Sequence, residues 1–302
     1  MQPRLIGVIC KDAGAANQIA HYISNNSNNY IYALLEPAFS IFKNVLGEVE
    51  NHELSQVVEL ADELLTGTGW SSDFEWEGIR GGLKSKKKVV THLDHWNNFR
   101  ERFIRNTELI LPEEIWVSDE YSMNIAQEQL IETKVIMKED YFLQYQLDQI
   151  SKLSTDDLGI RGGNKNRVLF ISEPLIDITG CGEFTQVSGI PDLKHEFLST
   201  IYETLSFIPN IRIRPHPSEK SEDFLQYESK KGVSISSEPM LATDLAWADF
   251  VVGIDSYALF VADNARIPTA SISPWLNREI SIPRGNIEFL ERCELVGFLG
   301  GK

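Results

Sequence analysis

Residues 5–10 have the sequence LIGVIC, and residues 11–17 continue with KDAGAAN. The first stretch is short, apolar and rich in β-branched residues, which is typical of a buried parallel strand. The second is a turn of small residues, after which apolar side chains at Ile19, Ala20 and Ile23 follow helical spacing. These residues predict a strand, a tight turn and a helix, the unit from which parallel α/β sheets are built.

The same alternation runs through the rest of the chain. Further strands are expected at residues 30–35, 88–93, 114–117, 167–171, 211–214, 233–235, 250–253 and 269–272. Helices are expected at residues 57–65, 123–130, 144–153, 193–205, 241–248, 256–264 and 286–293. The character changes between residues 143 and 166, where polar and Gly-rich segments follow a helical one. We therefore predict an α/β chain of two Rossmann-like domains, residues 1–155 and 165–302, facing across a cleft, with the final helix near the junction.

Composition and charge narrow the class of protein. A length of 302 residues suits two domains, and 42% hydrophobic with 24% charged residues is typical of a folded globular chain. The net charge of −16 makes nucleic acid an unfavourable partner. The sequence contains no apolar run long enough for a transmembrane helix and does not begin like a signal peptide, so a cytoplasmic location is expected. Three cysteines, Cys10, Cys181 and Cys293, are too few and too far apart for a disulfide framework or a zinc pattern.

One basic run interrupts this acidic sequence. Lysines occupy four of the five positions from Lys84 to Lys88, just before the apolar pair Val89 and Val90. The run predicts a solvated helix end that leads into a strand. A peripheral contact with a membrane surface or an anionic acceptor is the functional alternative.

Polar side chains gather where the expected strands end. Ligands of open parallel sheets bind at the carboxyl ends of strands, so these positions are the candidate site. In the first half they are Asp12, Gly14 and Asn17, the loop Gly67-Thr68-Gly69 with Trp70 beside it, and Asp94 with His95. In the second half they are Ser172, Glu173, His216, Asp255 and Ser256.

The sharpest local signal is Arg214-Pro215-His216-Pro217. Two prolines fix the backbone around His216, and an imidazole so held can give a hydrogen bond or a proton to a phosphate oxygen. Arg214 ends the preceding strand and can add positive charge. Downstream, Asp255 and Ser256 follow another strand at a helix start, where free backbone N–H groups bind phosphate, although a plain N-cap is the alternative role for Ser256.

These two motifs, followed by residues 262–268, resemble the donor domain of GT-B glycosyltransferases. They are similar in particular to bacterial sialyltransferases and polysialyltransferases, which carry an HP motif and a downstream serine motif. The resemblance implies that the C-terminal half holds a CMP-sugar and that His216 helps the nucleotide leave. The donor contacts it implies are Ser172, Glu173, Arg214, His216, Pro217, Asp255 and Ser256. The N-terminal half would bind a glycan acceptor through Gly14, Asn17, Gly69, Trp70 and His95.

The general base has two candidates. The resembling families place an acidic D/E-D/E-G motif at an N-domain strand end, and here Asp94 keeps the acid while His95 and Trp96 replace the second acid and the glycine. Asp12 is the rival, with helix N-capping as its structural alternative. His92, Asp94 and His95 could form a metal site only if the strand ended at residue 93, and we predict none. The sequence contains no Asp-x-Asp, the usual basis of a metal-bridged diphosphate.

The leading hypothesis is therefore a metal-independent glycosyltransferase that needs no cofactor, with a CMP-linked nonulosonate as donor and a glycan as acceptor. A UDP-sugar epimerase or hydrolase of the same fold is the second hypothesis. A non-catalytic protein that binds a nucleotide or a polysaccharide is the third, because fold alone does not separate them.

Overall fold

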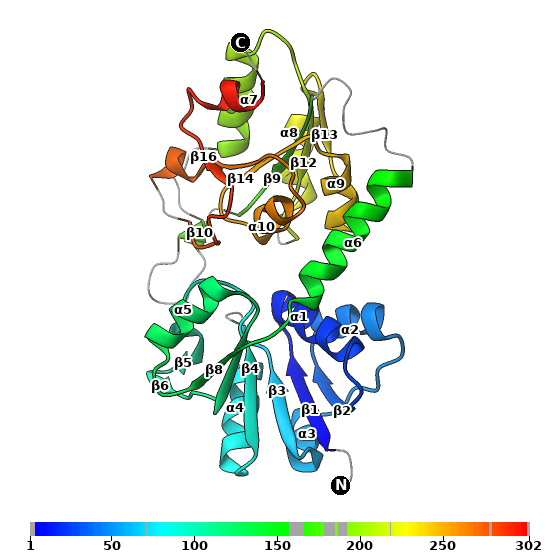
Figure 1. Cartoon of the computed structure of the whole chain (residues 1–302), viewed down its shortest axis with the longest axis vertical. Coiled ribbons are helices and arrows are strands. Elements are labelled where there is room, and N and C mark those ends of the chain that lie inside the picture. Colours follow the sequence, from blue (N-terminus) through cyan, green and yellow to red (C-terminus); the bar gives the residue numbers. More distant parts are fainter. Residues whose placement is uncertain are drawn as a thin grey trace. The chain divides into compact units, whose positions relative to one another are not determined.

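A computed structural model describes residues 4–69, 72–156, 166–174, 176–177, 185–186, 192–217, 219–277 and 280–300. The chain divides into two compact units, Met1–Tyr145 and Gln146–Lys302. Each unit contains a six-stranded sheet (Figure 1). Trp70 and Cys181 lie outside the described residues.

The N-terminal sheet has the strand order β2-β1-β3-β4-β7-β8, and every neighbouring pair is parallel. Its strands are β1 (Leu5–Cys10), β2 (Asn29–Leu34), β3 (Glu63–Thr66), β4 (Lys88–His92), β7 (Glu114–Val117) and β8 (Lys134–Met137). The chain reverses its direction across the sheet between β1 and β3. This point is where ligands of doubly wound sheets bind.

Helices cover both faces of this sheet. They are α1 (Ala13–Ser24), α2 (Ala38–Leu46), α3 (Leu54–Leu60), α4 (Phe74–Lys84) and α5 (Glu120–Gln129), while η1 (Glu101–Phe103) and the hairpin β5 (Ile104–Arg105) with β6 (Glu108–Leu109) follow β4. Residues of α1 and α2 pack with Val8 and Leu65 in one buried cluster. Residues of α3, α4 and α5 pack with Ile9 and Leu64 in another, so alternate residues of each strand serve opposite faces.

The C-terminal sheet has the order β13-β12-β9-β14-β15-β16, again parallel throughout. Its strands are β9 (Arg167–Ile171), β12 (Asn210–Arg214), β13 (Val233–Ile235), β14 (Phe250–Gly253), β15 (Thr269–Ser271) and β16 (Glu288–Phe289). Numbered in chain order this is 3-2-1-4-5-6, the order of dinucleotide-binding Rossmann sheets, and its reversal point lies between β9 and β14.

The remaining elements include α6 (Tyr141–Asp156), which spans the boundary between the units, and the short pair β10 (Ile176–Asp177) with β11 (Thr185–Gln186). The others are α7 (Leu193–Thr204), η2 (Ser221–Phe224), α8 (Leu225–Glu228), α9 (Leu241–Trp247), α10 (Tyr257–Asn264), η3 (Ser273–Leu276) and α11 (Leu295–Phe298). Buried residues of α7, α8 and α11 pack in one cluster with β9, β12 and β14. No helix of the described residues is long and apolar enough to cross a membrane.

Two sequence-based predictions were wrong. The helix expected at residues 57–65 ends at Leu60, because Leu64 and Leu65 are buried as the central strand β3. The final helix expected at residues 286–293 is absent, because Glu288 and Phe289 pair with β15 as the edge strand β16. In both cases pairing within a sheet outweighs an amphipathic local pattern.

The basic run leads from a helix into a strand, as predicted. Lys84 ends α4 and Lys88 begins β4. The Lys87 ammonium donates to the carbonyls of Glu59 and Ala61, and Lys88 pairs with Glu114 at 3.4 Å. Two of these lysines are therefore bound within the unit, at the amino end of β4.

Candidate functional site

Asp12 lies at the reversal point of the N-terminal sheet, directly after β1. It is the N-cap of α1, where its Oδ1 accepts hydrogen bonds from the backbone N–H of Gly14 at 2.9 Å and Ala15 at 3.4 Å. The cap fixes the carboxyl group at the carboxyl edge of the sheet. The structural role foreseen for Asp12 is therefore present, and it does not exclude a chemical one.

Asp94 follows β4 and lies against the same turn. Its Oδ1 is 2.8 Å from Nη1 of Arg102, and both side chains are more than nine-tenths buried. Arg102 comes from η1 and also donates to Oγ1 of Thr68 at 3.1 Å. A Cβ added to Gly14 would lie only 1.9 Å from Oδ2 of Asp94, so the glycine allows this carboxylate to approach α1.

A third carboxyl group, Glu75, completes the cluster from the first turn of α4. Its Oε1 accepts from the backbone N–H of Lys11 at 2.7 Å and Asp12 at 2.9 Å. The residue is 2% exposed. Asp12, Glu75, Asp94 and Arg102 therefore form one group of three carboxyls and one guanidinium, in which Asp12 is half-buried, and we call it the carboxyl cluster.

The two aspartates of the carboxyl cluster are electrostatically unequal. Burial, together with the nearby negative charge of Asp94, raises the pKa of Asp12 to about 7. Burial is the largest influence on Asp94 and acts to raise its pKa, but the Arg102 guanidinium, His95 and the hydrogen bonds to the carboxylate together outweigh it, so the net pKa is lowered. A hydrogen bond between the two carboxyl groups contributes with opposite sign to each. Asp94 therefore stays ionised while Asp12 exchanges a proton near neutral pH.

His92 and His95 do not join the cluster as metal ligands. His92 is buried, its Nε2 is 3.3 Å from Oγ of Ser118, and burial lowers its pKa to about 4. The Nδ1 of His95 accepts from the backbone N–H of Trp96 at 3.0 Å. Among the residues that the structure describes, no group of three or more His, Cys, Asp or Glu side chains could hold a metal ion.

The other residues assigned to an acceptor have different surroundings. Gly69 lies beside Glu75 and Asp12, because an added Cβ would be 3.4 Å from Oε2 of Glu75 and 3.5 Å from Cβ of Asp12. Asn17 donates to the carbonyl of Ala13 one turn earlier, at 2.8 Å. The aromatic residues Trp76, Trp96 and Phe99 are buried, as expected of core residues.

At the reversal point of the C-terminal sheet, Glu173 joins two strand ends. Its Oε1 accepts from the backbone N–H of Ile254 at 3.2 Å and Asp255 at 2.9 Å. Asp255 in turn accepts from the backbone N–H and the hydroxyl of Ser281, at 2.8 and 2.9 Å. Ser256 is the N-cap of α10, and its Oγ accepts from the N–H of Ala258.

His216 follows β12, and hydrogen bonds of Glu219 connect its turn to Ser172 at the end of the neighbouring strand β9. The Oε2 of Glu219 accepts from the backbone N–H of His216 at 2.8 Å. The Oε1 accepts from the hydroxyl of Ser172 at 2.9 Å and from the ammonium of Lys194 at 3.1 Å. His216 and Pro217 are exposed, so the turn presents the imidazole at the surface from a fixed backbone.

Arg214, also assigned to the donor, is engaged elsewhere. It pairs with the fully buried carboxylate of Asp244, which also binds Arg212 at 3.0 Å. The guanidinium of Arg212 lies 4.0 Å from the centroid of the Trp247 ring. The two arginines share one face of β12, as the alternation predicts, and both point toward α9.

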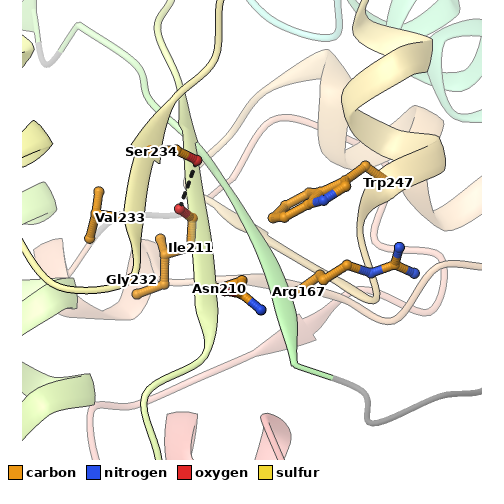
Figure 2. A pocket seen from close by; sticks show the side chains of 7 residues that line it. All are labelled: Arg167, Asn210, Ile211, Gly232, Val233, Ser234 and Trp247. Atoms are coloured by element: carbon orange, nitrogen blue, oxygen red, sulfur yellow. Dashed lines mark hydrogen bonds between the residues drawn. The ribbon is translucent and has the colours of Figure 1, made fainter. Parts of the chain in front are cut away.

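An open groove of about 380 Å³ lies at the amino ends of β9, β12 and β13, the opposite edge from the strand-end residues described above (Figure 2). Two of its polar side chains already have partners: Ser234 donates to the carbonyl of Ile211 at 3.3 Å, and Arg167 pairs at 2.9 Å with Asp249, which does not line the groove. The groove contains none of the sequence-predicted site residues.

Sequence reasoning missed Glu75, Arg102, Glu219 and Lys194. Glu75 and Arg102 lie in helical turns rather than at strand ends, so a search of strand ends passes over them. Glu219 comes three residues after His216, and the acid after the His-Pro turn was the one available signal.

The chain has no match among protein-family models or curated protein sequences. Its structure is similar to that of Staphylococcus aureus MnaA in complex with UDP, with a TM-score of 0.59, 13% identity, and coverage of 89% of this chain and 79% of that one. It is also similar to a glycosyltransferase of kitacinnamycin, with a TM-score of 0.53, 11% identity and coverage of 99% and 91%. The wall teichoic acid polymerase TagF is similar with a TM-score of 0.52 and 11% identity, and the match covers 92% of this chain and 72% of that one. The chain therefore has the two-domain α/β fold of GT-B glycosyltransferases.

Proposed function

We propose that this chain is a glycosyltransferase that moves a sugar from a nucleotide-activated donor to an acceptor hydroxyl, with Asp12 as the general base. The observation that carries the proposal is the carboxyl cluster at the reversal point of the N-terminal sheet. It holds one carboxyl group, Asp12, with a pKa of about 7 beside a second that stays ionised.

This inequality suits the chemistry of glycosyl transfer. An acceptor hydroxyl must lose its proton as it attacks the sugar, and a base is most effective when its pKa lies near the working pH. Asp94 is tied to Arg102 and is a weaker base because its pKa is lowered. Of the two candidates that the sequence left open, Asp12 is therefore the better one, and Asp94 sets its proton affinity.

The donor is assigned to the carboxyl edge of the C-terminal sheet. His216, on a turn that Glu219 holds, would donate to a phosphate oxygen as the nucleotide leaves. Ser256 and the first N–H groups of α10 would bind the same phosphate, since a helix start favours anions. Ser172, Glu173 and Asp255 would shape this site by fixing its backbone rather than by touching the donor, given their internal hydrogen bonds. Arg214 would add positive charge only from behind the site, because Asp244 holds its guanidinium.

The donor proposed from the two motifs is a CMP-linked nonulosonate, used without a divalent metal. A monophosphate leaving group needs no metal bridge, which agrees with the absence of Asp-x-Asp from the sequence. The solved structures similar to this chain include MnaA with UDP and TagF soaked with CDPG. Their ligands make a nucleoside diphosphate donor the principal alternative, and with it a UDP-sugar epimerase or hydrolase that needs no acceptor.

A donor panel tests the proposal. CMP-, CDP-, UDP- and GDP-linked sugars are incubated with the purified chain in EDTA, with and without a mixture of oligosaccharide acceptors, and free nucleotide is measured. Release of CMP that increases with acceptor supports the proposal. Release of UDP without acceptor supports the alternative, and no release from any donor contradicts both.

A further inference from the structure

Glu75 belongs to α4 in sequence but serves the turn after β1. It accepts hydrogen bonds from the backbone N–H groups of residues 11 and 12, which lie more than sixty positions earlier in the chain. These bonds use one oxygen, Oε1, and they fix the backbone of Asp12 from outside its own helix. Orientation of the Asp12 carboxyl therefore depends on Glu75 as well as on the cap of α1.

The second oxygen of Glu75 is placed differently. Oε2 is buried and has no hydrogen-bond partner among the described residues. It lies near Gly69, as the Asp12 side chain does: a Cβ added to Gly69 would be 3.4 Å from Oε2 of Glu75 and 3.5 Å from Cβ of Asp12. A neutral glutamine oxygen would accept the same two N–H bonds, whereas a buried carboxylate oxygen without a partner is costly. The two hydrogen bonds to Oε1 therefore do not by themselves explain why residue 75 is a glutamate rather than a glutamine.

Building on the proposed function, we propose that Glu75 is a positioning residue for Asp12: Oε1 fixes the turn that presents Asp12, and the charge of the Glu75 carboxylate makes the ionised Asp12 carboxylate a stronger base, which takes up the proton of the acceptor hydroxyl as that oxygen attacks the sugar.

The charged groups that face Asp12 agree with this role. Asp94 at the end of β4 raises the pKa of Asp12, and Arg102 from η1 lowers it. Glu75 from α4 accepts the backbone N–H of Asp12, and Cys10 from β1 lies beside the same turn, where burial together with Glu75, Asp12 and Asp94 raises the pKa of its thiol. Three carboxyl groups therefore share a single guanidinium. Such a surplus of negative charge favours the binding of one proton among the three carboxyl groups. The raised pKa of Asp12 indicates that Asp12 binds this proton.

The test is a direct titration that needs no substrate. Protein labelled with ¹³C at aspartate carboxyl carbons is titrated by NMR between pH 4 and 9, and the Asp12 signal is identified by its loss in Asp12→Asn. We expect a midpoint near 7 in the native chain. Glu75→Gln keeps an oxygen for both N–H groups but removes the charge, so its midpoint should fall by about one pH unit.

Glu77→Gln is the matched control. Glu77 lies in the same first turn of α4, is about half exposed and pairs with Arg80, so its loss should leave the Asp12 midpoint unchanged. Glu75→Asp draws the carboxylate back by one methylene and should lower the midpoint by less than Glu75→Gln does. It also serves as the test if the glutamine variant does not fold.

The inference is overturned if the Asp12 midpoint in a folded Glu75 variant equals that of the native chain or rises. That outcome would reduce Glu75 to an anchor of the turn. The titration uses no donor, so its result holds even if the chain shows no transferase activity. Conversely, an Asp12 midpoint that does not move would contradict the role of Glu75 but not the proposed transferase function. Where transfer is measured, the acid limb of kcat/KM should move with the midpoint while the affinity for free nucleotide stays constant.

Discussion

Gly14→Ala should have two opposing effects: alanine favours the helix α1, but its Cβ would come too close to Asp94 in the carboxyl cluster. Gly14 lies in the first turn of α1, where alanine would ordinarily stabilise a helix by up to about 1 kcal/mol. The new Cβ, however, would lie 1.9 Å from Oδ2 and 3.0 Å from Cγ of Asp94. The Asp94 side chain cannot simply rotate away, because Arg102 holds its other oxygen and the residue is buried.

The loss of stability in Gly14→Ala depends on how far the Asp94 side chain must shift to admit the new Cβ. Overpacking a well-packed site costs typically about 1–3 kcal/mol, and full loss of one partner from a buried ion pair costs about 3–5 kcal/mol. Because Asp94 would shift without being removed, we expect a net destabilisation of about 1–2 kcal/mol after the helix gain. The midpoint of the Asp12 titration should fall as well, since the Asp94 charge is displaced from it.

Thermal melts of Gly14→Ala and Gly81→Ala, measured side by side, check this prediction. Gly81 lies in α4, where an added Cβ would meet Val58 at 3.4 Å in ordinary contact, so alanine there should leave the melting temperature unchanged or raise it. A Gly14→Ala variant that melts as high as the native chain, with an unmoved Asp12 midpoint, would refute the proposed packing of Asp94 on this turn.

Three other predictions concern charge and pH. Asp94→Asn removes the charge that raises the pKa of Asp12, so the Asp12 midpoint in an NMR titration should fall below 7 while the melting temperature drops through the unpaired Arg102. His216→Ala should lower turnover about a hundredfold and weaken nucleotide binding in calorimetry, since a phosphate donor is lost; unchanged values would remove His216 from the donor site. His92 has a folded pKa of about 4 against an ordinary 6.5, so it is neutral when buried while the unfolded chain takes up a proton as pH falls. Its stabilising contribution is therefore present above pH 6.5 and is lost between pH 6.5 and 4, by roughly 3 kcal/mol, and melts of His92→Asn should show a correspondingly weaker pH dependence.

The fold could be predicted from the sequence because its central strands are continuous apolar runs. Residues 5–10, 167–171 and 250–253 have no other stable environment than a sheet covered on both faces. The two errors concern segments whose own pattern is ambiguous. Leu64 and Leu65 continue the apolar spacing of a helix, and Glu288 and Phe289 become a strand only because β15 offers an unpaired edge.

The candidate site could be predicted only where it follows the strands. Asp12 and Asp94 stand directly after β1 and β4, so the parallel topology brings them to one edge of the sheet. Their unequal proton affinities could not be foreseen, because they depend on Arg102 and Glu75, which come from η1 and α4. Similarly, the partner of Arg214 is a buried aspartate thirty positions downstream, and no local motif indicates that the arginine turns toward it.

Comparison of Asp12→Asn with the native chain, in a transfer assay across pH 5 to 9 on whichever donor of the panel is used, tests the central proposal most directly. Asparagine keeps an oxygen for the cap of α1, so the variant should remain folded and bind nucleotide with unchanged affinity. The native chain should show an acid limb with an apparent pKa near 7, and Asp12→Asn should lose about 10²- to 10⁴-fold in turnover at the optimum, the usual contribution of a general base. Near-native turnover of a folded Asp12→Asn variant would contradict the assignment of Asp12 as the general base.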